Sequence, residues 1–184
     1  MQKLDLKVNA EVGSIMALIS SVAPSAVLAG GYLRDLATGV TPKDLDVFVS
    51  EEDYFAATDY LYREGYHCTK HLNSGYVCLP AEVDAISDFT HPDPSLIPVN
   101  LVGLRGNLTM DQHVARFDFG ICQIGYRNGE VFVTDAFMQD LQEQTFTLTR
   151  EGEASRECSM KRWERISPRF PGWTLVVPEI EATF

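Results

Sequence analysis

The stretch from residue 26 to residue 49 constrains the fold more than any other part of the chain. The apolar residues 26–29 predict a short strand that runs directly into Gly30 and Gly31. Residues 31–38 then predict a helix, and residues 45–49 predict the next strand. Two strands and a helix must therefore pack around one tight Gly-Gly turn.

Two aspartates follow this turn at the start of the second strand. Asp44 and Asp46 are two residues apart, so a strand places both on one face, with Cα atoms roughly 6.6–7 Å apart. Neighbouring carboxylates repel each other, and a divalent cation relieves that repulsion. Gly30 and Gly31 allow close approach of the backbone to a ligand, and the helix start offers free amides to a phosphate. This combination predicts a Mg²⁺ or Mn²⁺ site beside a phosphate; the alternative is a plain turn beside a solvated strand edge.

The rest of the sequence predicts an α+β fold, in which helices flank a mixed sheet. We expect further helices over residues 9–22, 51–65, 109–115 and 154–167, and further strands over 66–70, 76–79, 99–104, 119–126, 131–134 and 146–149. Asn128-Gly129 is a typical hairpin turn, and four prolines predict a loop over residues 80–98. We expect one domain over residues 1–150, followed by a basic helix and tail over residues 151–184.

Charge and composition narrow the possible functions. The net charge of −11 disfavours nonspecific binding to nucleic acid, which depends on neutralising phosphates with basic side chains. The sequence has no apolar run of 18 residues and begins with charged residues, so we expect a cytoplasmic protein without a membrane partner. We expect reduced thiols and no zinc site, because the candidate residues lack ligand spacing: His67, Cys68, His71, Cys78, Cys122 and Cys158.

Two motifs carry a resemblance to a known family. The first is Gly30-Gly31-Tyr32-Leu33-Arg34-Asp35 with Asp44-Leu45-Asp46, which fits G-G-x-V-R-D followed by D-x-D. The second is Arg116-Phe117-Asp118-Phe119-Gly120-Ile121-Cys122-Gln123, which is similar to R-R-D-F-T-I-N-A. Both resemble the DNA polymerase beta-type nucleotidyltransferase superfamily, and within it the head domain of tRNA CCA-adding enzymes and bacterial poly(A) polymerases.

The resemblance implies transfer of a nucleoside monophosphate from an NTP such as ATP to a hydroxyl, with release of pyrophosphate. The acceptor would be an RNA 3′ end, a protein or a small molecule. Asp44 and Asp46 would be the catalytic pair that holds Mg²⁺ or Mn²⁺. The nucleotide would be bound by Gly30, Gly31, Arg34, Arg116 and Asp118.

The departures from the family pattern define a second hypothesis. Phe117 replaces the second arginine of the motif, and neutral Asn100 stands where the superfamily often supplies a third carboxylate. Asp84 and Asp118 are possible substitutes for that carboxylate. The alternative is therefore a catalytically weak or inactive nucleotide-binding or protein-interaction module. The residues after the basic helix leave no room for tRNA-binding domains, so CCA addition itself is not expected.

Three arginines of the C-terminal segment share one helical face. Arg162, Arg165 and Arg169 follow one another at intervals of three and four residues. One interpretation is a solvated helix face. The other is a basic lip that receives a triphosphate or an RNA end.

Overall fold

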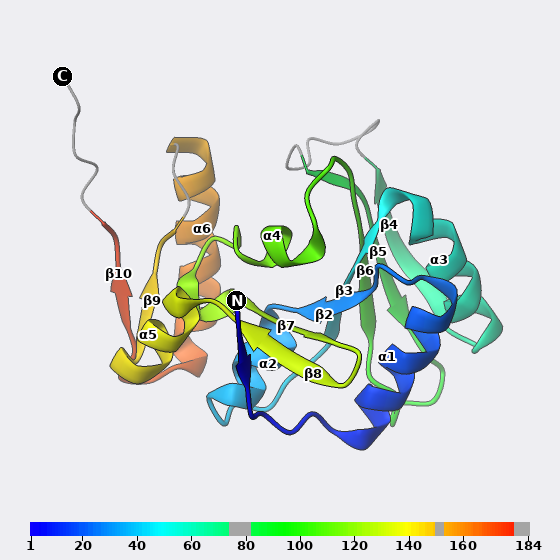
Figure 1. Ribbon diagram of the computed structural model, residues 1–184, viewed down its shortest axis with the longest axis horizontal. Coiled ribbons are helices and arrows are strands. Elements are labelled where there is room, and N and C mark those ends of the chain that lie inside the picture. The colour runs from blue at the N-terminus through cyan, green and yellow to red at the C-terminus, as the bar shows by residue number, and fades with distance from the viewer. Residues whose placement is uncertain (74–81, 150–152, 179–184) are drawn as a thin grey trace.

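The computed structural model describes residues 1–73, 82–149 and 153–178, and its body is one mixed eight-stranded sheet (Figure 1). The strand order is β1-β8-β7-β2-β3-β6-β5-β4. All neighbouring strands are antiparallel except β3 and β6, which are parallel. The strands are β1 Gln2–Leu4, β2 Val27–Ala29, β3 Leu45–Ser50, β4 His67–Asn73, β5 Val83–Thr90, β6 Val99–Leu104, β7 Ile124–Arg127 and β8 Glu130–Val133.

Helices flank this sheet, and the C-terminal part adds a small second sheet (Figure 1). The α-helices are α1 Ala10–Val22, α2 Gly31–Ala37, α3 Tyr54–Arg63, α4 Met110–Val114, α5 Asp135–Glu143 and α6 Glu153–Ile166. The 3₁₀ turns are η1 Glu51–Asp53, η2 Gly120–Cys122 and η3 Ser167–Arg169. The second sheet pairs β9 Thr145–Thr147 with β10 Thr174–Val176 in parallel. The α+β class expected from the sequence is confirmed.

Alternation along β3 separates the hydrophobic core from the candidate site. Leu45, Val47 and Val49 are fully buried in the main core, against residues of α1 and α3. Asp46 and Phe48 point to the other face of the sheet, as the two-residue period of a strand requires. Val114 and Met110 of α4 form a smaller apolar cluster on that side. The sheet thus has one closed face and one partly open face.

Local signals in the sequence placed several elements correctly. Asn9 caps α1, and its side chain accepts a hydrogen bond from the Glu11 amide at 2.8 Å. Asn128 and Gly129 form the tight connection between β7 and β8, both with positive φ, as a type I′ turn requires. The expected helix over residues 51–65 divides into η1 and α3, and α6 matches the predicted basic helix closely.

Residues 80–98 do not form a continuous loop as predicted, because β5 occupies Val83–Thr90. Val83, Ala85 and Phe89 alternate with more exposed residues and are buried, which is the pattern of a half-buried strand. Pro92 and the prolines after it follow this strand, so they do not interrupt its hydrogen bonds. The prolines from Pro92 onward mark the end of a strand, and the loop prediction was wrong for residues 83–90.

Two further predicted strands change, and one helix was missed. The strand predicted over residues 119–126 begins only at Ile124, because the Asp140 carboxylate accepts the Ile121 amide at 2.7 Å and holds η2 in place. The strand predicted near Phe146 is β9, which pairs with β10 and not with the main sheet. Helix α5 had not been predicted. The strand expected over residues 76–79 lies outside the described residues.

No helix in the described part of the chain is both long enough and apolar enough to cross a bilayer.

Candidate active site

A cavity of about 560 Å³ lies over the open face of the sheet and contains every site residue predicted from the sequence. It gathers parts of the chain that are far apart in sequence, from β3, α2, α6 and the segment after α4. The residues that had been predicted and that line it are Gly30, Gly31, Arg34, Asp44, Asp46, Arg116 and Asp118. The fold therefore brings the two motifs together, and the roles of the individual residues remain predictions.

Asp44, Asp46 and Asn100 form the polar centre of the cavity. The parallel register of β3 and β6 places Asn100 directly beside Asp46. The Asn100 amide nitrogen donates to Asp44 Oδ2 at 3.2 Å and to Asp46 Oδ1 at 3.1 Å. A neutral amide thus bridges the two carboxylates, and in the absence of a cation it partly offsets their mutual repulsion.

The position of Asp46 in the cavity makes its ionised form unfavourable. Burial raises the pKa of Asp46 to about 6, and the neighbouring charge of Asp44 acts in the same direction. The hydrogen bond from Asn100 and the positive charges of Arg162 and Arg34 act against this rise. A divalent cation beside Asp46 would favour the ionised form and remove most of the cost.

The donor set fits a hard divalent cation. Asp44 and Asp46 offer carboxylate oxygens, and the Asn100 amide lies beside them. Mg²⁺ and Mn²⁺ prefer such oxygen ligands. Mg²⁺ is usually held by one or two carboxylates together with substrate phosphates. Within residues 1–73, 82–149 and 153–178, no group of three His, Cys, Asp or Glu side chains is placed to hold a metal ion. A metal ion bound here would be held by the two carboxylates of Asp44 and Asp46.

The residue that sequence reasoning missed is Asp88. Asn100 has Asp46 as its neighbour on β3 and Asp88 as its neighbour on β5. Asp88 also lines the cavity. The suggested third carboxylate Asp84 forms an ion pair with Arg105 at 2.7 Å. The alternation of apolar residues over 83–89 is the signal that could have identified Asp88, once the segment is recognised as a strand.

The Gly-Gly turn lies directly against the aspartates. Gly30 has φ +74° and ψ −120°, a conformation that suits glycine, and a Cβ there would lie 3.3 Å from the Phe117 ring. A Cβ on Gly31 would lie 3.0 Å from Asp46 Oδ2. The missing Cβ of Gly31 therefore lets the start of α2 lie close to the Asp46 carboxylate, and the missing Cβ of Gly30 lets the turn pack against Phe117.

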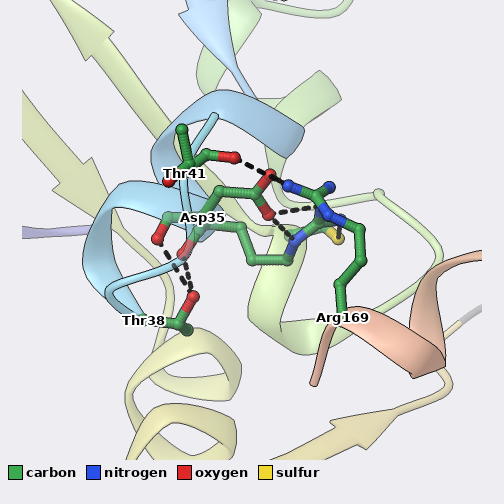
Figure 2. Close-up of polar contacts among 6 residues, drawn as sticks. Asp35, Thr38, Thr41 and Arg169 are labelled. Carbon is green, nitrogen blue, oxygen red and sulfur yellow. Dashed lines mark hydrogen bonds and ion pairs between the residues drawn. The ribbon is translucent and has the colours of Figure 1, made fainter. Parts of the chain in front are cut away.

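Arg34 and Asp35 form a buried network with Arg169 of η3 (Figure 2). Arg34 donates twice to Asp35 Oδ1, at 2.9 and 2.6 Å. Arg169 contacts Asp35 Oδ2 at 2.8 Å and donates to the Thr41 carbonyl at 2.8 Å. These contacts fix the C-terminal segment to α2. Arg34 thus contributes positive charge to the cavity, while its hydrogen bonds go mainly to Asp35.

Asp118 links the second motif to α6. Arg162 donates to Asp118 Oδ1 at 2.9 Å, and the Ser159 hydroxyl donates to Asp118 Oδ2 at 3.1 Å. Arg162, Arg165 and Arg169 all line the cavity, so the basic-lip interpretation fits their position. The cavity lining contains equal numbers of basic and acidic side chains, namely Arg34, Lys43, Arg116, Arg162, Arg165 and Arg169 against Asp35, Asp44, Asp46, Glu82, Asp88 and Asp118. It is formally neutral in a chain of net charge −11.

Comparison with protein families gives a match over most of the chain. The model of the Gabija anti-defense 2 family matches residues 7–144. The chain belongs to this family. The matched segment contains both motifs and ends before α6. A search of curated proteins finds no significant match.

Solved structures with a similar fold are tRNA-processing nucleotidyltransferases. A CCA-adding enzyme in complex with ATP is similar with a TM-score of 0.65 and 16% identity, over 95% of this chain and 43% of that chain. The Thermotoga maritima CCA-adding enzyme in complex with tRNA gives 0.63 and 15%, over 97% of this chain and 44% of that chain. The chain thus spans less than half of the length of these structures. The expected nucleotidyltransferase fold is confirmed.

Proposed function

We propose that this protein is a metal-dependent nucleotidyltransferase that moves a nucleoside monophosphate from an NTP to a hydroxyl and releases pyrophosphate. The observation that carries the proposal is the single cavity in which the Asp44–Asp46 pair lies against the Gly30-Gly31 turn. The family name describes action against Gabija, and nucleotidyl transfer is the chemistry that we propose for that action.

Different residues of the cavity would bind the triphosphate and the metal ion in such a transfer. Arg162 and Arg165 bring positive charge from α6 to the site of the triphosphate, and Gly31 places the start of α2 close to Asp46. A Mg²⁺ or Mn²⁺ ion held by Asp44 and Asp46 would supply charge that activates the hydroxyl and stabilises the leaving pyrophosphate. The acceptor oxygen forms a bond to the α-phosphorus, the bond from that phosphorus to pyrophosphate breaks, and the hydroxyl proton is released to water.

A second function, a nucleotide-binding or protein-interaction module without turnover, is favoured by one observation. Neutral Asn100 occupies the central position beside Asp46, and its amide nitrogen donates hydrogen bonds to both carboxylates. If the third carboxylate is required for chemistry, this arrangement binds nucleotide and metal without reacting.

The two functions are separated by pyrophosphate release. The protein is incubated with each of the four NTPs, labelled at the α-phosphate, with Mg²⁺ or Mn²⁺ and with RNA and protein acceptors. We expect metal-dependent pyrophosphate release that the Asp44→Ala, Asp46→Ala double variant abolishes. Asp59→Ala, on the exposed surface of α3, is the matched control. Release that survives in the double variant would contradict catalysis by this pair. Thermal stabilisation by nucleotide without any release would support the binding module.

A further inference from the structure

The floor of the cavity consists of two successive rows of side chains that cross β3, β6 and β5. The polar row consists of Asp46, Asn100 and Asp88. The apolar row consists of Phe48, Val102 and Ile86. In each row the strand register places the three residues side by side. The rows are two residues apart along each strand, which corresponds to roughly 7 Å.

Phe117 extends the apolar row toward the Gly-Gly turn. Its ring centroid is 5.2 Å from that of Phe48, and it also faces Gly30. Leu104, the next residue of β6 on the same face, lines the cavity beyond Val102. Phe48, Ile86 and Phe117 are only partly buried, so the apolar surface is in contact with the cavity.

The basic side chains border the polar row from a different direction. Arg162 and Arg165 enter the cavity from α6, and Arg34 enters from α2. Arg34 Nη2 is 3.9 Å from the point where a Gly31 Cβ would lie, which is itself 3.0 Å from Asp46 Oδ2. Figure 1 shows α6 on one side of β2 and β3, and β5 and β6 on the other. A triphosphate is matched by the arginine side, so the apolar row remains for the acceptor.

We propose that the acceptor is the side chain of a tyrosine in a partner protein, an inference that rests on the proposed nucleotidyl transfer. The phenol oxygen lies over the polar row, while the ring lies on the apolar row. This oxygen bonds to the α-phosphorus, the bond to pyrophosphate breaks, the phenol proton passes to water, and the products are a tyrosyl nucleotide and pyrophosphate. A serine hydroxyl is too close to its own backbone, so peptide N–H and C=O groups would have to lie unpaired on Ile86 and Phe48, which is unfavourable.

Charge favours a protein over an RNA end at this position. An RNA acceptor brings a phosphate next to its terminal ribose, and this phosphate would lie on or near the apolar row. The rest of the RNA strand would then extend over a protein of net charge −11. Such a protein binds a polyanion weakly, because it has few basic side chains to neutralise the phosphates. The aromatic pair Phe48 and Phe117 could stack on a base, so RNA is the competing acceptor in the test.

The test uses the full chain, α-labelled NTPs and three acceptors. These are a peptide library with a fixed central tyrosine between randomised residues, the same library with serine at that position, and an RNA oligonucleotide with a free 3′ end. We expect label on the tyrosine library. We also expect Ile86→Ser to lower kcat/KM for the peptide on the order of tenfold, the scale of a changed apolar pocket contact, while the KM for NTP stays within about twofold. Phe55→Ser, on the exposed surface of α3, is the matched apolar-to-polar control.

The outcomes distinguish the acceptor from the reaction. Label on the RNA end or on the serine library in place of tyrosine, or pyrophosphate release without any labelled tyrosine, overturns the tyrosine assignment and leaves nucleotidyl transfer intact. An equal loss of peptide activity in Ile86→Ser and Phe55→Ser would also overturn it. No pyrophosphate release with any acceptor would instead refute the proposed function on which the inference rests.

Discussion

The substitution Asp46→Asn is expected to make the protein more stable at neutral pH although it removes a site residue. The pKa of Asp46 is raised from 3.8 to about 6 in the folded protein, so the folded state holds this proton more tightly than the unfolded chain does. The stability linked to this group is therefore fully present below about pH 4 and is lost as the pH rises through 6. A difference of about 2 pKa units, at about 1.36 kcal/mol each, corresponds to about 3 kcal/mol at pH 7.5.

Asparagine is nearly isosteric with aspartate, and its carbonyl can still accept the hydrogen bond from Asn100. We therefore expect Asp46→Asn to raise the free energy of unfolding by up to about 3 kcal/mol at pH 7.5, and to have much less effect at pH 4.5. The measurement is urea denaturation in the presence of EDTA at both pH values. Asp59→Asn, which removes a surface ion pair with Arg63, serves as the control and should change little.

We also expect Mg²⁺ and NTP together to raise the melting temperature of the parent protein but not that of Asp46→Asn, because one of the two carboxylates is gone. Reduced stability of Asp46→Asn at pH 7.5, or a gain that is as large at pH 4.5 as at pH 7.5, would refute this account of the buried charge.

Three other substitutions test the framework around the site by the same urea denaturation. Gly30→Ala should destabilise the protein by more than about 2 kcal/mol, since the residue has φ +74° and an added Cβ would lie 3.3 Å from Phe117. Gly39→Ala is the control, because Gly39 has φ +75° but open space around it, and it should cost less. Equal effects of the two substitutions would contradict the contact argument. Asp140→Ala should cost roughly 3 kcal/mol, because the buried carboxylate accepts two backbone amides and one hydroxyl, and a loss below about 1 kcal/mol would be inconsistent with that. Arg169→Ala should cost about 2 kcal/mol by leaving one oxygen of the buried Asp35 without its cation. The loss should be smaller in an Asp35→Asn background, where Arg169 keeps its hydrogen bond to the Thr41 carbonyl but has no charged partner in Asp35, and an equal loss would contradict the role of the pair.

The sequence predicted those parts of the fold whose signals are local. The alternation over residues 45–49 predicts β3 and the side on which Asp46 lies, and the Asn9 cap predicts the start of α1. The two motifs predicted that Gly30 and Asp118 share one site, and both line the cavity. Each of these predictions depends on neighbours within a few residues or on a pattern already known from other chains.

The elements that were missed depend on distant contacts. Strand β5 was obscured by the prolines near it, and without β5 nothing in the sequence connects Asp88 with Asn100. Asp140 lies on α5, a helix that had not been predicted. It is almost fully buried, and its carboxylate accepts hydrogen bonds from the Ile121 amide and from Thr145 and Thr147 of β9. The partner of β9 is a strand nearly thirty residues later, a pairing that no local pattern specifies.

The position of β3 and β6 in the middle of the sheet has a consequence for amide hydrogen exchange. Both strands are bonded to a neighbour on each side, so their amides should exchange only when the whole sheet unfolds. Helix α6 belongs to no such array and meets the rest of the site through side chains such as Arg162. Binding of a nucleotide should therefore slow exchange in α6 and leave Asp46 unchanged, because one wall of the cavity is fixed by the sheet and the other is held by contacts that a ligand can replace.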